Sequence, residues 1–362
     1  MRRIALLTPL LTTADAISND LYGMQAVLKQ RGHDARLFAN ETKVSGVAAA
    51  HATKIEDFLR NADDLLIYHY SMGWNFGLQL LHDLPCRTVV KYHNITPPEF
   101  FAGVSVDYEN VCRHGREQIK DIARARCDLY LADSEYNASE LLNEGVDECS
   151  VVAPFHHVDK LELLAPDAHV LDQFVNDKVN VLMVGRVAPN KGHAALIDAL
   201  AIYRREYNSD ARLLIVGKED GPLLKYSQWL RELVVSLGLE DSVVFTGGVS
   251  DEQLKAYYLA ADLFMLTSGH EGFCVPLVEA MALKVPIIAC ASSAIPATVG
   301  NAGLVWQERN PYLLAASIDH LNRDESVSVE LGLLGRQRYE QCFSNERIGG
   351  SFVDALSRAS LI

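Results

Sequence analysis

Two carboxylates eight positions apart in the second half of the chain carry the strongest chemical signal. Glu271 follows an apolar segment and a glycine, and Glu279 lies inside a helix that the pattern predicts from about Pro276 onward. This spacing does not suit two ligands of one metal ion. Each carboxylate can instead accept paired hydrogen bonds from neighbouring hydroxyls, as on a ribose or hexose ring. Two ordinary surface carboxylates are the alternative, which the glycine, phenylalanine and proline standing in register between them disfavour.

The start of that helix has chemistry of its own. Gly272, Phe273 and Cys274 lead into it, and Pro276 stands in its first turn, where proline is favoured. Backbone amides at a helix start point outward with the positive end of the helix dipole, which favours an anion. We therefore expect an anionic group of a ligand beside this turn.

Two cations lie on another strand-to-helix turn. Arg186 and Lys191 stand between a predicted strand at 179–184 and the helix that follows it. A guanidinium fork and a point-like ammonium at the mouth of a cleft suit a diphosphate. The segment is not a P-loop, because its glycine spacing is wrong and it has no Lys-Ser or Lys-Thr pair. Two ordinary loop charges are the alternative, which the glutamates downstream disfavour.

The elements that must position these residues follow from the hydrophobic pattern. Short apolar runs alternate with segments of helical period, as in βαβ units around a parallel sheet. In the first half we expect strands at 3–7, 35–38, 65–68, 88–92 and 129–132, and helices at 16–31, 55–61 and 108–126. In the second half we expect strands at 179–184, 211–216, 242–246, 263–267, 286–289 and 303–305, and helices at 193–207, 228–237, 251–260, 276–283 and 311–323. Two doubly wound sheets place a ligand cleft at the carboxyl ends of their strands.

The chain length indicates two domains. A chain of 362 residues is long for one ordinary core and suits two α/β domains of middling size. We expect a first Rossmann-like domain at 1–160 and a second at 161–344, joined within the segment 154–177, which lacks a firm period. The tail reads as one more amphipathic helix, and we expect 345–362 to pack back on the first domain.

Composition narrows the class of protein. Hydrophobic residues make up 49% and charged residues 22%, so both halves can bury a core. The net charge of −14 argues against a nucleic-acid partner. Seven scattered cysteines without close spacing fit reduced thiols. The short apolar run after Met1, interrupted by Pro9, is interpreted as a buried strand rather than a signal peptide, and no stretch approaches the ~20 apolar residues of a membrane span. We expect a cytoplasmic protein.

Taken together, the motifs around Arg186, Lys191, Glu271 and Glu279 resemble those of the retaining glycosyltransferases of family 4, the glycosyl transferases group 1, which adopt the GT-B fold. The resemblance covers the whole second domain and is looser over the first. It implies two Rossmann-like domains facing each other across a cleft. The second would hold a nucleotide-diphosphate sugar, and the first would hold the acceptor.

The resemblance also implies roles for single residues. Glu279 would bind the ribose of the donor and Glu271 would lie near the donor sugar. Arg186 and Lys191 would hold the diphosphate. The remaining donor contacts are expected from Gly272, Phe273 and Cys274 near the sugar and phosphates, and from Gly247, Gly248 and Val249 beside the nucleobase.

In the first domain, His93 follows a predicted strand and opens the segment His-Asn-Ile-Thr-Pro-Pro. Family members carry a histidine at a comparable point that approaches the donor sugar from the acceptor side, which makes His93 a candidate for that role. A buried, hydrogen-bonded structural histidine is the alternative. His69, His156 and His157 are interpreted as structural. A metal site built from them is not expected, because no carboxylate or cysteine stands at ligand spacing.

The sequence departs from the family pattern at several positions. Many relatives have paired glycines in the loop after the first strand, whereas 12–18 contains none, so side chains there hold the backbone away from the phosphates. Cys274 and Lys284 stand where glycines are common. The sequence also has no Asp-x-Asp, the motif of metal-bridged donor binding, so we expect no metal ion and no cofactor. Cations and a helix end would neutralise the leaving diphosphate.

These features predict a hexosyltransferase acting with retention on a glycan or lipid-linked glycan acceptor. The resemblance implies front-side displacement, with His93, Glu271, Arg186 and Lys191 as catalytic candidates. GDP-mannose is the favoured donor and a UDP-hexose the second choice. A nucleotide-sugar epimerase, a phosphorylase and a nucleotide-sugar-binding or regulatory protein of the same fold are the alternatives. A dehydrogenase is disfavoured, because no Gly-x-Gly-x-x-Gly follows a strand.

A basic stripe at helical spacing lies within the helix predicted at 108–126. It comprises Arg113, Arg116, Lys120 and Arg124, with acidic residues interleaved. A solvated helix face is the default interpretation. The sharper hypothesis is contact with anionic phospholipid or a lipid-diphosphate acceptor, at the inner face of a membrane.

Overall fold

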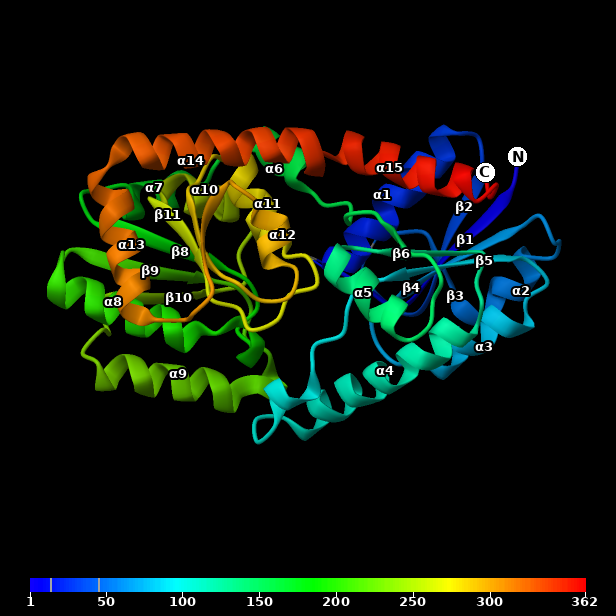
Figure 1. Ribbon diagram of the computed structural model, residues 1–362, viewed down its shortest axis with the longest axis horizontal. Coiled ribbons are helices and arrows are strands. Elements are labelled where there is room, and N and C mark those ends of the chain that lie inside the picture. The colour runs from blue at the N-terminus through cyan, green and yellow to red at the C-terminus, as the bar shows by residue number, and fades with distance from the viewer. Residues whose placement is uncertain (14, 45) are drawn as a thin grey trace. The chain divides into compact units, whose positions relative to one another are not determined.

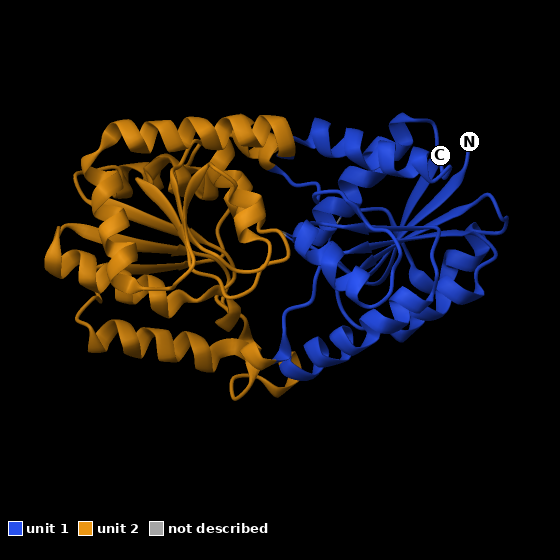
Figure 2. Ribbon diagram, viewed as in Figure 1, with its two compact units in different colours: residues 1–98, 109–157, 343–362 blue, residues 99–108, 158–342 orange. Residues whose placement is uncertain are grey.

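The computed structural model describes residues 1–13, 15–44 and 46–362 and divides into two compact units. Unit 1 comprises 1–98, 109–157 and 343–362, and unit 2 comprises 99–108 and 158–342 (Figure 2). The expected first domain, 1–160, thus ends at 157, and it loses 99–108 to the other unit, which the sequence did not indicate. Ala14, in the glycine-free loop at 12–18, lies outside the described residues.

Unit 1 is built on a seven-stranded parallel sheet with the order β3-β2-β1-β4-β5-β6-β7 (Figure 1). Strand β4 is buried along its whole length, because a parallel sheet is covered on both faces, and this explains its continuous apolar run. Strands β3 and β7 are short edge strands that left no recognisable pattern in the sequence. The strands are β1 (Arg3–Thr12), β2 (Asp34–Lys43), β3 (Ala49–His51), β4 (Leu65–Tyr70), β5 (Arg87–Tyr92), β6 (Leu129–Ala132) and β7 (Ser150–Val151).

The helices of unit 1 come from both the start and the end of the chain. Helix α15 packs on α1, and Phe352, Ile348 and Leu356 join Leu21 and Met24 in the buried core. This packing assigns the C-terminal segment to unit 1. The helices are α1 (Ala16–Gln30), α2 (Ile55–Phe58), α3 (Asn75–Asp83), α4 (Val106–Arg124), whose first residues belong to unit 2, α5 (Glu135–Asn143) and α15 (Asn345–Arg358).

Unit 2 repeats the plan with a six-stranded parallel sheet in the order β10-β9-β8-β11-β12-β13. The chain runs outward from β8 to β10 and then returns to the other side of β8 with β11. The carboxyl ends of β8 and β11 are therefore the topological switch point, the place where α/β sheets bind ligands. The strands are β8 (Val179–Val184), β9 (Ala211–Val216), β10 (Val243–Gly247), β11 (Leu263–Leu266), β12 (Ile287–Cys290) and β13 (Gly303–Trp306).

The helices of unit 2 include four that the sequence did not predict, one of which is the five-residue α12. Two of them, α6 and α7, fall in the segment 154–177 that showed no firm period. Another, α14, lies against Met281 of α11 through Gly335 and against Lys284, just after α11, through Gly332. It has no apolar stripe there, so a hydrophobic pattern does not reveal it. The helices are α6 (Val158–Leu163), α7 (Ala168–Phe174), α8 (His193–Glu206), α9 (Leu224–Ser236), α10 (Asp251–Ala260), α11 (Val275–Ala282), α12 (Ile295–Val299), α13 (Pro311–Arg323) and α14 (Glu325–Arg338).

The two parallel sheets, each flanked by helices, confirm the predicted α/β class with two Rossmann-like units. Among the described residues, none of the helices combines the length and the apolar character that crossing a membrane requires.

Candidate functional site

The two loops that the sequence singled out leave neighbouring strands of unit 2. The loop carrying Arg186 and Lys191 follows β8, and the loop carrying Glu271 follows β11. Because β8 and β11 pair in parallel, both loops emerge at the same edge of the sheet, at its switch point. The fold therefore brings together residues that lie 80 positions apart in the sequence.

At this edge Lys191 and Glu271 form a close ion pair. The Lys191 Nζ atom donates hydrogen bonds to both carboxylate oxygens of Glu271, at 2.7 and 2.8 Å. The hydroxyl of Ser268 donates a third hydrogen bond, at 2.6 Å, to Oε1 of Glu271. Side-chain exposure is 19% for Lys191 and only 7% for Glu271, so Lys191 is the more accessible partner of the pair.

Backbone contacts lock the two loops to each other. Gly269 N–H donates to the carbonyl of Asn190 at 2.7 Å, and the Thr267 hydroxyl donates to the carbonyl of Gly192 at 2.9 Å. Gly192 adopts φ 71°, and a Cβ atom there would stand 2.2 Å from the Thr267 carbonyl oxygen. Only glycine fits this position, so it sets the distance between the loops.

Glu279 lies on the second turn of α11 and is buried. The hydroxyl of Tyr258, on α10, donates a 2.7 Å hydrogen bond to its Oε2 atom. Burial raises the pKa of the Tyr258 hydroxyl well above its ordinary value, and the neighbouring carboxylate raises it further, so the phenol stays a donor. Tyr258 did not stand out in the sequence, because its position on an apolar helix face is typical of a core residue.

Cys274 and Lys284, two positions that depart from the family pattern, have a backbone conformation typical of glycine. Cys274 is the N-cap residue with φ 79°, and Lys284, two residues after the helix ends, has φ 59°. Both lie in the left-handed region that favours glycine. Pro276 is in the first turn of α11, as predicted. Burial raises the pKa of the Cys274 thiol, so it remains a neutral group beside the helix start.

Arg186 engages a separate pair of side chains in unit 2. Its Nη1 atom donates to Oδ2 of Asp220 at 3.1 Å and to the Tyr108 hydroxyl at 2.9 Å, and its guanidinium lies over the Tyr108 ring. The side chain is 42% exposed. Neither partner stood out in the sequence. Asp220 follows β9 at the same edge of the sheet, and this position after a strand is the only feature that could have indicated it.

Gly248 and Val249 follow β10, also at this edge of the sheet. A Cβ atom on Gly248 would stand 2.8 Å from the side chain of Lys218, so that lysine lies across the glycine. Lys218 follows β9 and is a further cation that sequence reasoning did not single out. Gly217 beside it approaches the carbonyl of Gly185 so closely that a Cβ atom there would stand 1.9 Å away.

His93 belongs to unit 1, where it follows β5. Its Nδ1 atom lies 2.9 Å from Oδ2 of Asp133, and its Nε2 atom lies 2.8 Å from Nδ1 of His69. Its side chain is 3% exposed. Both ring nitrogens are therefore engaged within unit 1, and a hydrogen bond to a sugar would require one of them to be released.

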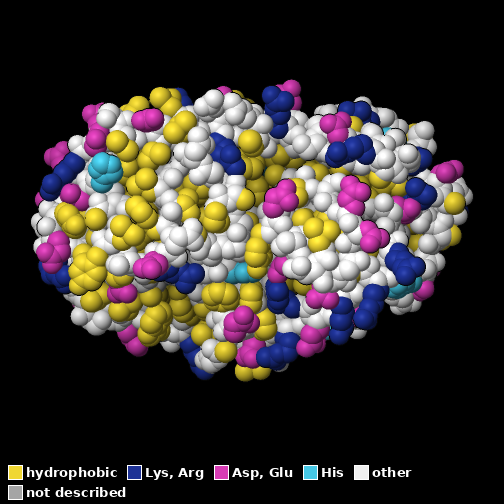
Figure 3. Space-filling model, viewed as in Figure 1, with side chains coloured by type: hydrophobic (Ala, Val, Ile, Leu, Met, Phe, Trp, Pro, Cys, Tyr) yellow, Lys and Arg dark blue, Asp and Glu magenta, His cyan; other side chains and the backbone are white. Residues whose placement is uncertain are grey.

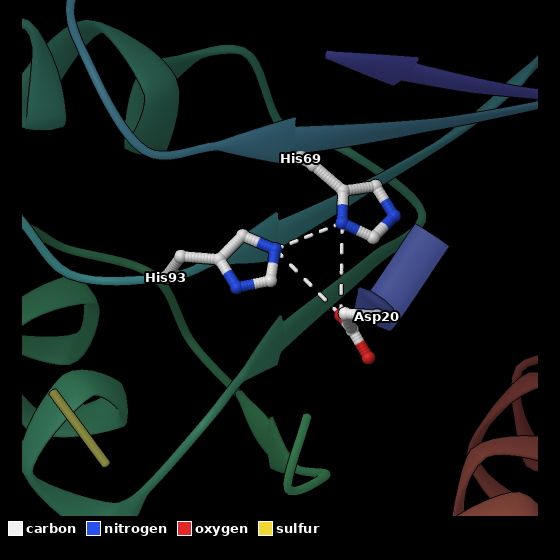
Figure 4. Close-up of side chains that lie close together, drawn as sticks. All are labelled: Asp20, His69 and His93. Atoms are coloured by element: carbon white, nitrogen blue, oxygen red, sulfur yellow. Dashed lines mark hydrogen bonds and ion pairs between the residues drawn. The ribbon is translucent and has the colours of Figure 1, made fainter. Parts of the chain in front are cut away.

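The surroundings of His93 correct one premise of the sequence analysis. The absence of a carboxylate at ligand spacing from His69 was misleading, because α1 carries Asp20 to this point from 49 residues away (Figure 4). Burial raises the pKa of Asp20 to about 6 and lowers the pKa of His69 well below its ordinary value. Burial also acts to raise the pKa of Asp133, but the nearby His93 and Lys91 outweigh this effect and hold the pKa below its ordinary value.

His156 and His157 are not members of this cluster and have other partners. His156 Nε2 contacts the carbonyl of Phe343 at 2.8 Å, and His157 Nδ1 contacts the Asn19 amide at 3.2 Å. His156 thus tethers the segment leading to α15, a structural role.

Solved structures with the same two-unit plan are known. The chain superposes on sucrose-phosphate synthase from Thermosynechococcus elongatus with a TM-score of 0.76 at 20% identity, covering 99% of both chains. It superposes on HepE from Anabaena in complex with UDP-glucose with the same TM-score of 0.76 at 18% identity, covering 99% of this chain and 100% of that one. These likenesses show that the fold is GT-B.

Sequence comparison then gives the family. The family model for glycosyl transferases group 1 matches residues 171–338. A D-inositol 3-phosphate glycosyltransferase of Corynebacterium efficiens is 32% identical over 316 residues, which cover 80% of this chain and 71% of that protein. The chain belongs to the glycosyl transferases group 1, the retaining glycosyltransferases of family 4.

A further relative covers a smaller part of the chain. The GDP-mannose-dependent alpha-(1-6)-phosphatidylinositol monomannoside mannosyltransferase of Mycobacterium tuberculosis is 35% identical over 172 residues. This match spans 45% of this chain and 43% of that protein, so the chain accounts for less than half of the length of this relative.

Proposed function

We propose that the chain transfers a hexose, with retention of configuration, from a nucleoside-diphosphate sugar to a glycan or lipid-linked glycan acceptor. The observation that carries the proposal is the Lys191–Glu271 pair at the switch point of unit 2, beside the start of α11. An accessible cation, a fixed carboxylate and a helix start meet there, and this set suits a diphosphate linked to a polyol.

Each residue of the site has a part in this proposal. Lys191 and Arg186 hold the diphosphate together with the amides near Gly272, and no metal ion is required for its charge. Glu271 accepts hydrogen bonds from the sugar, and Glu279 accepts them from the ribose. Phe273 and Cys274 shape the wall near the phosphates, and Gly248 and Val249 line the nucleobase.

The reaction is a front-side displacement. The bond between the anomeric carbon and the diphosphate oxygen breaks, and the acceptor oxygen forms its bond on the same face through an oxocarbenium-like state. The leaving phosphate takes the proton of the incoming hydroxyl, so no enzymic base is required. Lys191 and the helix start stabilise the charge that develops on the diphosphate. His93 is the candidate for a contact with the sugar from unit 1.

GDP-mannose is the proposed donor and a UDP-hexose the second candidate. The mycobacterial relative named as GDP-mannose-dependent supports the first, and the fold shared with HepE bound to UDP-glucose is compatible with the second. For the acceptor, relatives named for phosphatidylinositol monomannoside and inositol 3-phosphate support a polyol or a lipid-linked glycan.

Thermal unfolding against a panel of nucleotide sugars tests the donor. We expect GDP-mannose or a UDP-hexose to raise the melting temperature, and the Lys191→Met protein to show a smaller rise. Stabilisation only by nucleotides that lack a diphosphate would contradict the site. Release of sugar from the stabilising donor without acceptor separates an enzyme from a binding or regulatory protein. Recovery of an epimeric nucleotide sugar would favour the epimerase alternative.

A peripheral membrane contact at α4 is the proposed route to a lipid-linked acceptor, at the cytoplasmic face of a membrane. Figure 3 shows basic and acidic side chains interleaved over this helix. Arg113 pairs with Glu109, and Arg116 donates to Glu140 at 2.7 Å, so much of the stripe is neutralised within the protein. Replacement of Arg113, Arg116 and Lys120 by glutamine should reduce co-sedimentation with anionic liposomes, and unchanged binding would end this part of the proposal.

A further inference from the structure

Three side chains of unit 1 converge at its own topological switch point. Asp20 lies on α1, which follows β1. His69 lies on β4, and His93 directly follows β5. The strands β1 and β4 are neighbours between which the chain changes direction, so they correspond to β8 and β11 of unit 2. Figure 4 shows the three side chains pointing toward one another from these separate elements.

We propose that Asp20, His69 and His93 form a buried binding site for a divalent transition-metal ion such as Zn²⁺. The proposal rests on the convergence of their ligand atoms. Nδ1 of His69 and Nε2 of His93 lie 2.8 Å apart, and Oδ2 of Asp20 lies 3.6 Å from the first and 3.7 Å from the second. A point about 2 Å from all three atoms exists in their plane, which matches Zn–N and Zn–O bonds of roughly 2.0–2.2 Å.

The partners of His93 and Asp20 fit those of metal ligands. His93 presents Nε2 to the cluster while its Nδ1 atom lies 2.9 Å from a carboxylate oxygen of Asp133, the second contact that metal-bound histidines usually make. The other oxygen of Asp20, Oδ1, accepts the Phe155 backbone N–H at 2.8 Å. Both contacts orient the remaining atom of each side chain into the cluster.

An unsatisfied buried atom points to a bound cation. The Asp20 side chain is fully buried, and its Oδ2 atom has no hydrogen-bond donor anywhere in the described part of the chain. A buried carboxylate oxygen without a partner is costly. A proton shared by the two histidines would account for their 2.8 Å contact, but it would leave this oxygen unbonded. A metal ion bound by Asp20, His69 and His93 would give this oxygen a partner.

The charges of the cluster also call for a cation. With neutral histidines, two carboxylates, Asp20 and Asp133, face one ammonium group, that of Lys91. Lys91 is completely buried and lies 2.9 Å from Asp133. The net charge of these groups is therefore −1. Two imidazole nitrogens and one carboxylate oxygen suit Zn²⁺ or a neighbouring divalent ion better than Mg²⁺ or Ca²⁺, which prefer oxygen ligands.

The role of this ion would be structural. The side chains of Asp20, His69 and His93 are exposed by 0%, 0% and 3%, so the site is closed to substrate-sized molecules. The ion would fasten α1 to the ends of β4 and β5. It goes beyond the proposed transfer reaction, in which the donor diphosphate is neutralised by residues of unit 2. The two proposals share only His93: with Nε2 on the ion and Nδ1 at Asp133, its ring would have no nitrogen left for the sugar. The ion would therefore replace the sugar contact proposed for His93 and leave the donor site of unit 2 unchanged.

Metal content and Co²⁺ titration test the proposal on the full chain. We expect one Zn²⁺ per chain in protein purified without chelator. After chelation, Co²⁺ should bind with visible absorption, and Asp20→Asn should weaken this binding at least about 100-fold, since loss of even an outer partner costs roughly 10–100-fold. Asp133→Asn should weaken it about 10-fold. His51→Gln, which replaces an exposed histidine on β3, is the matched control and should bind as wild type does.

X-ray absorption at the zinc edge of the wild-type protein gives a result that does not depend on the folding of any variant. We expect nitrogen and oxygen neighbours with the signature of two imidazoles. Sulfur neighbours would mean binding by cysteines and would overturn the proposal. A wild-type chain that binds neither Zn²⁺ nor Co²⁺, or an Asp20→Asn chain of unchanged affinity, would also overturn it and leave the shared proton as the account of the histidine pair. Nucleotide binding by the same proteins reports on unit 2 separately.

Discussion

Lys191 donates to both carboxylate oxygens of Glu271, at 2.7 and 2.8 Å, across the switch point of the unit 2 sheet. The pair joins the loop after β8 to the loop after β11, and it places a cation beside the start of α11. It is therefore both a structural link and, in the proposed function, the centre of the donor site.

A double-mutant cycle separates these two roles. Removing one partner of a buried pair leaves an uncompensated charge, so Lys191→Met and Glu271→Gln should each lower the free energy of unfolding by about 3 kcal/mol. The double variant should recover most of that loss, because neither charge remains. Transfer should nevertheless fall about 100-fold or more in all three proteins, since the diphosphate has lost its cation or the sugar its acceptor. Denaturant unfolding and initial rates measure the two effects. A double variant with wild-type transfer would refute the catalytic role.

The hydrogen bond from Tyr258 to Glu279 predicts a ribose-specific defect. Loss of charged hydrogen bonds to vicinal hydroxyls costs about 1.5–3 kcal/mol, so Glu279→Gln should weaken binding of the nucleoside diphosphate about 10–100-fold. The 2′,3′-dideoxy nucleotide, which lacks those hydroxyls, should bind both proteins equally. Tyr258→Phe should show a smaller loss of the same kind. Calorimetric titration with the two nucleotides measures the difference, and an equal loss for both would argue against ribose recognition.

The left-handed backbone of Lys284 predicts a stabilising substitution. At φ 59° a lysine is strained where glycine is not, so Lys284→Gly should raise the free energy of unfolding by about 1 kcal/mol. Inside a helix, replacing lysine by glycine should change the free energy of unfolding in the opposite direction. Lys120→Gly, in α4, should lower stability by about 1 kcal/mol. Urea unfolding of the two variants gives the comparison, and a loss of stability at both positions would contradict the strain argument.

The burial of His193, the first residue of α8, predicts that the folded protein loses stability in acid. Burial lowers its pKa to about 3, and the nearby Lys191 acts in the same direction. The unfolded chain therefore binds more protons than the folded chain between pH 3 and about 6.5. The free energy of unfolding should fall as pH is lowered through this window, by up to about 1.4 kcal/mol per pH unit from this residue.

The comparison of variants isolates this contribution of His193. His193→Gln should flatten the dependence of stability on pH in that window, while His82→Gln, at an exposed position of α3, should leave it as in the wild type. Equal slopes for all three proteins would show that His193 is not the source.

The sequence predicted those features that local patterns encode. Buried parallel strands such as β4 and β8 are nearly continuous apolar runs. The alternation of strands and helices places the loops that carry Lys191 and Glu271 at the carboxyl ends of strands, where parallel sheets bind ligands. Cys274 and Lys284 were recognised as positions typical of glycine, and both have positive φ.

The features that were missed depend on contacts between distant segments or on patterns without an apolar signal. Nothing in the sequence near His69 reveals Asp20, which arrives through the packing of α1 on the sheet. Asp220 and Tyr108 hold Arg186 only because 99–108 belongs to unit 2. Helix α14 packs through glycines, which a search for hydrophobic periodicity reads as a break.

A crystal structure of the protein with bound GDP-mannose or UDP-hexose tests the central claim most directly. We predict a diphosphate oxygen within hydrogen-bonding distance, about 3 Å, of Lys191 Nζ, with the guanidinium of Arg186 and the amides near Gly272 around the same group. A diphosphate bound elsewhere in the protein, with the Lys191–Glu271 pair untouched by donor, would contradict the account.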